Sequence, residues 1–315
     1  MNVLVTGGLG FLGSRLAEAL AADGHEVAAL DNGFRDSGVR PGGVRSIEAD
    51  VRDAGAVRDA CRGVDAVAHL AAIQGTANFY AIPDRVLDVN LRGTLNVADA
   101  CAAEGVRRLV FSSSSEVYGE PRVFPTPEEH PLEVPDPRNA RYSYGASKIA
   151  GELVVVSAAR GHGFEYTILR YHNVYGPAMG WDHVIPQFIR RLELGEEFTI
   201  QGDGEQTRSF CYVDDAVTAT AAAVGAPAAA NEILNVGNPE EITIGELAAL
   251  LAHVAGKPIE PRYVPFEGEG TRRRLPAVER AREVLGFRPQ VRLEDGLRAT
   301  HRWYAEELAR EEVRA

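Results

Sequence analysis

The chain has 315 residues, of which 45% are hydrophobic and 25% are charged, a composition that fits one or two globular domains. Because 33 basic residues face 45 acidic ones, the formal net charge is -12, and we expect no nucleic-acid partner. The three cysteines lie far apart in the sequence, which argues against a disulfide framework or a metal site. With no targeting pattern and no membrane-length apolar run, we expect a cytoplasmic protein with no membrane partner.

Short apolar runs alternate with helix-like stretches through the first half of the chain, a pattern typical of parallel strands joined by crossover helices. The predicted strands cover residues 3–5, 26–30, 46–49, 66–70, 108–111 and 166–169. Apolar residues three and four positions apart predict helices over 14–22, 54–61 and 91–103. The sequence therefore predicts an α/β fold with a Rossmann-type doubly wound parallel sheet.

From about Tyr175 the pattern changes to stretches interrupted by glycine and proline and mixed with shorter helices. We expect a smaller mixed α/β lobe here. The predicted division is a dinucleotide-binding domain over 1–175 and a substrate-binding lobe over 176–315. Residues 212–223 and 233–236 again resemble a helix and a strand, so segments near 211–237 are expected to return to the first domain.

A glycine-rich turn, TGGLGFLG (residues 6–13), joins the first predicted strand to a helix that begins near Phe11. In this context glycines let the backbone approach a pyrophosphate closely, and the amides at the helix end bind it. A turn that binds nothing is the less favoured alternative. The predicted cofactor contacts are Gly7, Gly10, Phe11, Leu12 and Gly13.

Asp31 ends the second predicted strand about twenty residues further on, and Asn32 follows it. A carboxylate at this place accepts hydrogen bonds from a ribose hydroxyl and repels a 2′-phosphate, so NAD is predicted rather than NADP. Asp31 could instead only cap a turn. The nearby Arg35 could serve a 2′-phosphate, but we give it less weight than Asp31.

Two further loops follow predicted strands and are expected to touch the adenine and ribose, because ligands of open parallel sheets lie at the carboxyl ends of the strands. They contribute Asp50, Val51, Leu70, Ala71 and Ala72. The two alanines could equally serve tight packing.

Tyr144 and Lys148 are four residues apart, which places both on one face of a helix. The ammonium is expected to lower the phenol's pKa from about 10, so that the phenolate can take a proton from an alcohol. Four serines, residues 112–115, follow the fifth predicted strand and are expected near the nicotinamide, although most could be ordinary turn serines. Glu116 comes next, and a structural and a catalytic role are about equally expected.

These motifs occur in the order found in the extended short-chain dehydrogenases/reductases of the NAD-dependent epimerase/dehydratase family, which the chain resembles over nearly its whole length. The matching segments are TGGLGFLG (6–13), LDN (30–32), HLAA (69–72), VNLRGT (89–94), SSSSEVYG (112–119), YGASK (144–148), RYHNVYG (170–176) and GDGEQTRSFCYVDD (202–215). The resemblance implies a catalytic triad of Ser114, Tyr144 and Lys148, supported by Asn90.

The same resemblance implies further binding residues. For the cofactor these are Asn90, Ser112, Tyr144, Lys148, Tyr171 and Val174, and for the substrate they are Ser114, Asn173, Val184, Arg208 and Arg274. An arginine pair suits a diphosphate because guanidinium groups form bidentate bonds, although either arginine could lie on the surface. A homodimer is also implied, through helices near 91–103 and 147–159. Their residues Leu153, Val155 and Val156 could instead face the sheet.

The family reaction implies that Tyr144 takes the proton of the 4-hydroxyl of a nucleoside-diphosphate sugar while NAD takes hydride from C4. Dehydratases of the family carry Asp-Glu after the catalytic serine, where this chain has Ser115 and Glu116, which disfavours dehydration. Glu116 is typical of UDP-glucuronate decarboxylases, but residues 180–186 do not resemble the decarboxylase loop. We therefore expect a 4-epimerase, most readily of a UDP-sugar, before a decarboxylase. A non-catalytic NAD-binding module has no need of Tyr144 and Lys148 together.

Overall fold

The computed structural model describes residues 1–35, 37–265 and 271–314. Its centre is a seven-stranded sheet in the order β11-β6-β5-β4-β1-β2-β3, in which every neighbouring pair is parallel. The strands are β1 (Asn2–Thr6), β2 (Glu26–Asp31), β3 (Arg45–Glu48), β4 (Ala66–His69), β5 (Arg108–Ser114), β6 (Glu165–Tyr171) and β11 (Glu232–Val236). The predicted fold class is confirmed, and all six strands predicted in the first half lie in this sheet.

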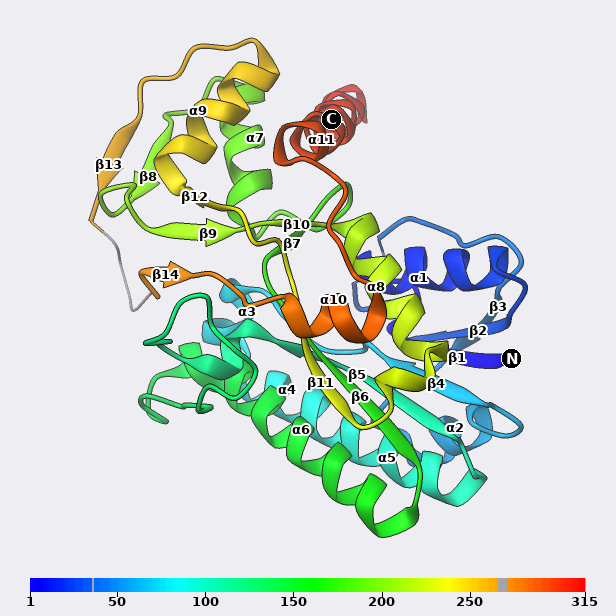
Figure 1. Cartoon of the computed structure of the whole chain (residues 1–315). Coiled ribbons are helices and arrows are strands. Elements are labelled where there is room, and N and C mark those ends of the chain that lie inside the picture. The colour runs from blue at the N-terminus through cyan, green and yellow to red at the C-terminus, as the bar shows by residue number, and fades with distance from the viewer. Residues whose placement is uncertain (36, 266–270, 315) are drawn as a thin grey trace.

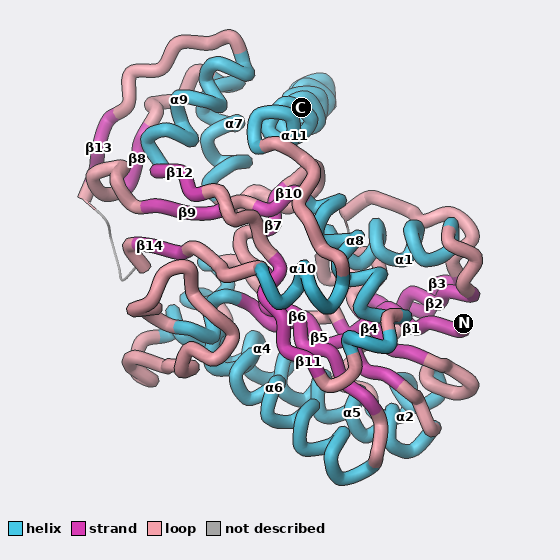
Figure 2. Tube along the Cα trace, viewed as in Figure 1, coloured by secondary structure: helices cyan, strands magenta, loops and turns pink. Residues whose placement is uncertain are grey.

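Helices cover both faces of the sheet (Figures 1 and 2). One face carries α2 (Ala54–Ala60), α4 (Pro83–Leu87), α5 (Gly93–Glu104) and α6 (Ser143–His162), and the other carries α1 (Phe11–Ala22) and α8 (Val213–Gly225). Each face has its own apolar core because helix residues three and four positions apart, such as Leu16 and Leu20, point at the sheet. The Cys61 and Cys101 thiols meet in one of these cores as buried free cysteines.

Except for α10, the C-terminal elements lie beyond the carboxyl edge of the sheet (Figure 1). The helices are α7 (Val184–Leu194), α9 (Ile244–Ala255), α10 (Glu279–Leu285) and α11 (Leu293–Arg314), and the short strands are β7 (Val174–Tyr175), β8 (Thr199–Gln201), β9 (Thr207–Ser209), β10 (Cys211–Tyr212), β12 (Glu241–Thr243), β13 (Arg262–Val264) and β14 (Arg273–Arg274). Helix α10 packs against β11 and α8 of the sheet domain. None of the helices in the described part of the chain has the length and apolar character needed to cross a bilayer.

The structure differs from the predicted elements at the end of β5 and in the segments around α3 and α5, close to the candidate site. Strand β5 runs to Ser114, three residues beyond the predicted end, so the first three serines are strand residues, and Ser115 opens a short 3-10 helix (Ser115–Tyr118). A π-helical turn (Asp88–Arg92) precedes α5, and α3 (Thr76–Ala81) follows the loop after β4. Such π-turns are frequent at functional sites. Here the turn aims Asn90 at the backbone N–H of Ile73, 2.8 Å away.

A buried ion pair ties α6 to the sheet. Arg170 of β6 donates two hydrogen bonds to Glu152 of α6, at 2.9 and 2.7 Å, and both side chains are at most 5% exposed. Ser113 also donates to Glu152, and Arg170 reaches the Tyr118 hydroxyl and the Glu128 carbonyl. Every charge in this cluster has a partner, which is the condition under which a low-dielectric interior tolerates ions.

Removing one member of this pair is expected to destabilise the fold strongly, because the other charge then stays buried without a partner. We expect Glu152→Ala to lower the free energy of unfolding by about 3–5 kcal/mol in urea titrations. The control is Arg298→Ala, which breaks the exposed i,i+4 pair with Glu294 and should cost about 0.3–0.5 kcal/mol. Similar losses for the two variants would contradict this account of the cluster.

Candidate functional site

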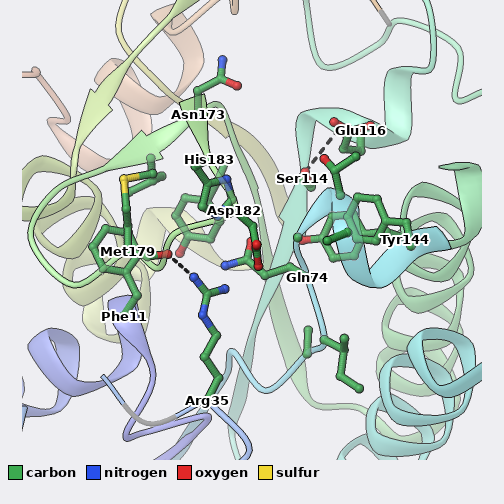
Figure 3. A pocket seen from close by; sticks show the side chains of 18 of the residues that line it. Phe11, Arg35, Gln74, Ser114, Glu116, Tyr144, Asn173, Met179, Asp182 and His183 are labelled. Atoms are coloured by element: carbon green, nitrogen blue, oxygen red, sulfur yellow. Dashed lines mark hydrogen bonds between the residues drawn. The ribbon is translucent and has the colours of Figure 1, made fainter. Parts of the chain in front are cut away.

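A cavity of about 1000 Å³ lies between the carboxyl edge of the sheet and the C-terminal elements (Figure 3). It is lined by the glycine turn, by the loops after β2, β4 and β5, by the start of α6, and by residues of the C-terminal lobe. In Figure 3, Tyr144, Ser114 and Glu116 stand on one side of the cavity, and Phe11 and Met179 stand on the other. Residues predicted from separate motifs therefore share one enclosed space.

The glycine turn at one end of the cavity is shaped for close approach. Gly7 has φ 70°, and a Cβ on Gly13 would lie 2.0 Å from the Gly7 carbonyl oxygen, so neither position accepts a side chain. Helix α1 begins at Phe11 with Gly10 as its N-cap and no side chain capping its amides. These free amides at the positive end of the helix dipole fit the pyrophosphate of a dinucleotide.

Asp31 lines the same end of the cavity, where its carboxylate accepts hydrogen bonds from the backbone N–H groups of Leu9 and Gly33. It is thus held against the glycine turn at the end of β2, in the place suited to ribose hydroxyls. Arg35, in the loop after β2, donates a hydrogen bond to the Met179 carbonyl oxygen (Figure 3). The arrangement suits NAD rather than a 2′-phosphorylated dinucleotide.

Tyr144, Ser114 and Lys148 come together at the other end of the cavity. Tyr144 and Ser114 stand on the same side of the cavity (Figure 3), and the Tyr144 ring stacks on Phe79 with centroids 5.0 Å apart. The Lys148 ammonium lies 5.6 Å from the centre of the Tyr144 ring and donates to the Ser112 carbonyl oxygen at 2.7 Å. The predicted spacing of tyrosine and lysine on one helix face therefore agrees with the geometry.

The expected lowering of the Tyr144 pKa is not what the structure shows. Burial and the nearby Glu116 carboxylate raise the pKa of the phenol, and the hydrogen bond with Ser114 acts in the opposite direction. Burial also lowers the pKa of Lys148 to about 7, against the attraction of Glu152. The prediction considered only the tyrosine–lysine spacing, whereas desolvation of both groups dominates here.

Glu116 is held between two arginines. Arg274 of β14 and Arg141, which precedes α6, both contact its carboxylate, the latter at 2.9 Å. Burial alone would raise the pKa of Glu116, but the charges and hydrogen bonds of the two arginines outweigh burial and keep it well below its ordinary value. Glu116 is therefore an ionised hydrogen-bond acceptor that joins the C-terminal lobe to the segment leading into α6.

The lobe side of the cavity is positively charged. Arg208 lies beside Arg274, and burial together with that neighbouring charge lowers the pKa of Arg208 to about 10. Its guanidinium donates hydrogen bonds to the carbonyl oxygens of Thr207 and Arg272. Arg274 also contacts Glu116, and with Arg208 beside it the pair of guanidinium groups suits a further anion, for which a diphosphate has the charge and geometry.

Most of the predicted site residues line this cavity. They are Gly7, Gly10, Phe11, Leu12, Gly13, Asp31, Asn32, Val51, Leu70, Ala71, Ala72, Ser112, Ser114, Glu116, Tyr144, Lys148, Tyr171, Asn173, Val174, Val184, Arg208 and Arg274. Two others stand outside the described lining. Asp50 bonds Arg52 and Asn32, while Asn90 is buried behind the wall and donates to the Ser147 hydroxyl at 3.0 Å. Asn90 thus acts on the cavity only through the Ile73 backbone and α6.

Several lining residues were not anticipated. Arg141 would have been found from its position three residues before Tyr144, on the approach to α6. Arg35 was considered only for a 2′-phosphate, and its contact with Met179 arises through the fold. Asp182 and His183 enter from the segment before α7. Burial and the Arg35 charge lower the pKa of His183 to about 4, so its imidazole is neutral near pH 7.

Residues 3–237 match the model of the NAD-dependent epimerase/dehydratase family. Among curated relatives, the UDP-N-acetyl-alpha-D-glucosaminuronate decarboxylase of Bacillus cytotoxicus is 34% identical over 316 residues, covering 96% of this chain and 97% of the relative.

Two solved structures from thermophiles share the fold. The UDP-glucose 4-epimerase of Thermotoga maritima with UDP-glucose has a TM-score of 0.90 and 34% identity, covering 98% of this chain and all of the other. The Thermus thermophilus UDP-glucose 4-epimerase complex with NAD has a TM-score of 0.86 and 33% identity, covering 96% and 99%. Together with the glycine turn and the Tyr144–Lys148 pair, these matches establish that the chain belongs to the NAD-dependent epimerase/dehydratase family of extended short-chain dehydrogenases/reductases.

Proposed function

We propose that this protein is a cytoplasmic, NAD-dependent UDP-sugar 4-epimerase, in which residues 1–175 with segments near 211–237 hold the cofactor and residues 176–315 hold the sugar nucleotide. The observation that carries the proposal is that Tyr144 and Ser114 line the same cavity as the glycine turn. The relatives include UDP-glucose 4-epimerases that resemble the chain over nearly its full length.

In the proposed reaction, Tyr144 acts as the phenolate, a form that the Lys148 ammonium and the positive charge of a bound NAD favour. It accepts the proton of the sugar's 4-hydroxyl, and the Ser114 hydroxyl holds the same oxygen in line. NAD, when bound, supplies the acceptor and later the donor of the C4 hydride. Arg208 and Arg274 hold the diphosphate, so that the 4-keto sugar can turn while the nucleotide stays in place. Tyr144 then returns the proton to the inverted alcohol, and the reaction has no net redox change.

The state of Glu116 favours epimerisation over the other outcomes of the family. Elimination of water needs an acid for the departing hydroxide, and decarboxylation leaves a carbanion at C5 that must be protonated. Glu116 is ionised and engaged by Arg141 and Arg274, so it cannot donate that proton. Epimerisation needs no acid beyond Tyr144.

UDP-glucuronate decarboxylase is the second candidate, because Arg141 and Arg274 are cations that could hold a sugar carboxylate and because curated relatives include UDP-sugar acid decarboxylases. NMR of incubations with NAD and UDP-glucose, UDP-N-acetylglucosamine or UDP-glucuronate separates the candidates. We expect inversion at C4 of at least one substrate. Release of CO₂ with a pentose product, or a stable 4-keto sugar, would refute the epimerase.

The control for this assay is Tyr144→Phe, which removes one oxygen and keeps the ring stacked on Phe79. We expect it to lower turnover by about 100- to 10,000-fold while NAD binding is retained. Tyr142→Phe removes a nearby phenol that is outside the cavity lining and should leave turnover within about twofold of wild type. Full activity of Tyr144→Phe would remove the basis of the mechanism.

The proton state of Lys148 gives a pH test of the site without a substrate. Its pKa falls from 10.5 to about 7 on folding because the ammonium is buried. Below pH 7 Lys148 is charged in both the folded and the unfolded protein, so folding bears the full cost of burying the ammonium. Between about pH 7 and 10.5 the unfolded chain binds more protons than the folded protein. The free energy of unfolding should therefore gain up to about 1.4 kcal/mol per pH unit from this group.

In urea titrations from pH 7.5 to 9.5, the cofactor-free wild type should gain stability relative to Lys148→Met, which has no proton to lose. At pH 7 the variant should be the more stable of the two because it buries no charge. Stability curves that stay parallel over this range would show that Lys148 is not the buried ammonium described here.

We also propose a homodimer formed through α5 and α6. Leu95 and Leu153 on these adjacent helices are 47% and 65% exposed, whereas Val155, which was also considered for the interface, is buried against the sheet. A pair of neighbouring helices with exposed leucines suits helix-to-helix packing with a second copy.

The dimer is expected to separate when a charge is placed on this face. In sedimentation velocity at micromolar concentration, we expect wild type to run as a dimer and Leu153→Glu as a folded monomer, since an unpaired carboxylate is costly to bury. Leu194→Glu introduces the same charge at a 39% exposed leucine of α7 and should remain dimeric. A monomeric wild type would refute the interface.

A further inference from the structure

Residues 176–183 form a strap between β7 and α7, and Met179, Asp182 and His183 of this strap line the cavity. Its first residue, Gly176, is packed between Val213 of α8 and Phe11 at the N-terminus of α1: a Cβ would lie 2.6 Å from the Val213 side chain and 3.6 Å from the Phe11 ring. Further along, a Cβ on Gly75 in the loop after β4 would lie 3.6 Å from the carboxylate of Asp182. The strap therefore runs from the start of α1 to the loop after β4, along the part of the cavity where a dinucleotide fits.

Side chains from three other elements hold the backbone carbonyl oxygens of this strap. Arg15 of α1 donates to Pro177 at 2.8 Å, Arg35 of the loop after β2 donates to Met179, and the Tyr304 hydroxyl of α11 donates to Gly180 at 3.1 Å. Trp181 packs edge-on against the Tyr304 ring, with centroids 4.6 Å apart. The strap is thus fastened to the sheet domain by two arginines and to the C-terminal lobe by aromatic contacts.

The local backbone shows that these contacts shape the strap. Ala178 has φ 63°, a left-handed conformation unfavourable for an alanine, and Gly180 has φ 90°. The Arg35 guanidinium lies close to Gly180, where a Cβ would be 2.2 Å from its terminal nitrogen, so a side chain there would require the guanidinium to shift. A non-glycine residue in this conformation persists only where the surroundings impose it.

Of the fastening side chains, Arg35 alone comes from the loop after β2, and Arg35, Met179, Asp182 and His183 all line the cavity. We propose that Arg35 acts as a clasp: its hydrogen bond to Met179 keeps the strap closed over the bound dinucleotide. The cofactor is thereby retained between the two halves of the reaction. The inference rests on the proposed function, because an enzyme that regenerates its NAD in each turnover has use for slow release. It assigns Arg35 a role in retention rather than in recognition of a 2′-phosphate.

The test is the rate at which NAD leaves the loaded protein. Protein saturated with radiolabelled NAD is diluted into excess unlabelled NAD, and the bound label is followed by rapid filtration. Loss of a charge-assisted hydrogen bond should accelerate release by at least about tenfold in Arg35→Met, which keeps the aliphatic stem. Arg35→Lys, which keeps a charged donor without the fork of the guanidinium, should fall between Arg35→Met and wild type.

The matched control is Arg45→Met, which removes an exposed arginine of β3 outside the cavity lining and should release NAD at the wild-type rate. An unchanged rate of NAD release from Arg35→Met would refute the proposed role of Arg35. So would faster NAD entry at unchanged release, which would make Arg35 an obstruction instead.

A second readout follows the strap itself without NAD. Of the two tryptophans, Trp181 lies in the strap and Trp303 in α11, so a Trp303→Phe background leaves Trp181 as the only reporter. We expect Arg35→Met in this background to raise acrylamide quenching of Trp181 fluorescence, and equal quenching would count against the clasp. A wild type that binds no NAD would instead contradict the proposed function, while the quenching comparison still decides whether Arg35 holds the strap.

Discussion

The contact between Gly7 and Gly13 is the constraint on which the rest of the site depends. Because neither position accepts a Cβ, α1 can begin directly after the turn that follows β1, with its free amides facing the cavity. Phe11, the first residue of that helix, then offers the surface on which the strap begins. A side chain at Gly13 would displace the helix, and the anion site and the anchorage of the strap would be lost together.

Buried charges connect parts of the molecule that are far apart in the sequence. Glu116 and Arg274 are separated by 158 residues, yet their contact links the end of the catalytic strand to β14 of the lobe. Arg141, which precedes α6, contacts the same carboxylate. Glu116 therefore connects the lobe to the helix that carries Tyr144. Such pairs add little net stability compared with apolar packing, but their directionality specifies how the parts fit together.

The sequence was most informative where function requires a local pattern. The glycine turn and the Tyr144–Lys148 spacing each lie within one strand–turn–helix or one helix, and the parallel sheet follows from the alternation of elements. What could not be predicted depends on distance in space. Arg35 reaches Met179 across 144 residues, and the raised pKa of Tyr144 arises from burial that a spacing rule does not contain. The π-helical turn at Asp88–Arg92 could not be predicted from its own sequence either, because its contact is between Asn90 and the distant backbone of Ile73.

In the proposed reaction the cofactor must stay fixed at one end of the cavity while the sugar moves at the other, and the two ends are built differently. At the dinucleotide end, carbonyl oxygens of the strap are fixed by Arg15, Arg35 and Tyr304, which restricts movement. At the sugar end, the proposed anchors are arginines that grip the diphosphate and leave the hexose to contacts with Ser114 and Tyr144. Inversion at C4 requires that the hexose turn while the nicotinamide stays still. A site that is fastened over the cofactor and anchored only through the diphosphate at the substrate meets both requirements.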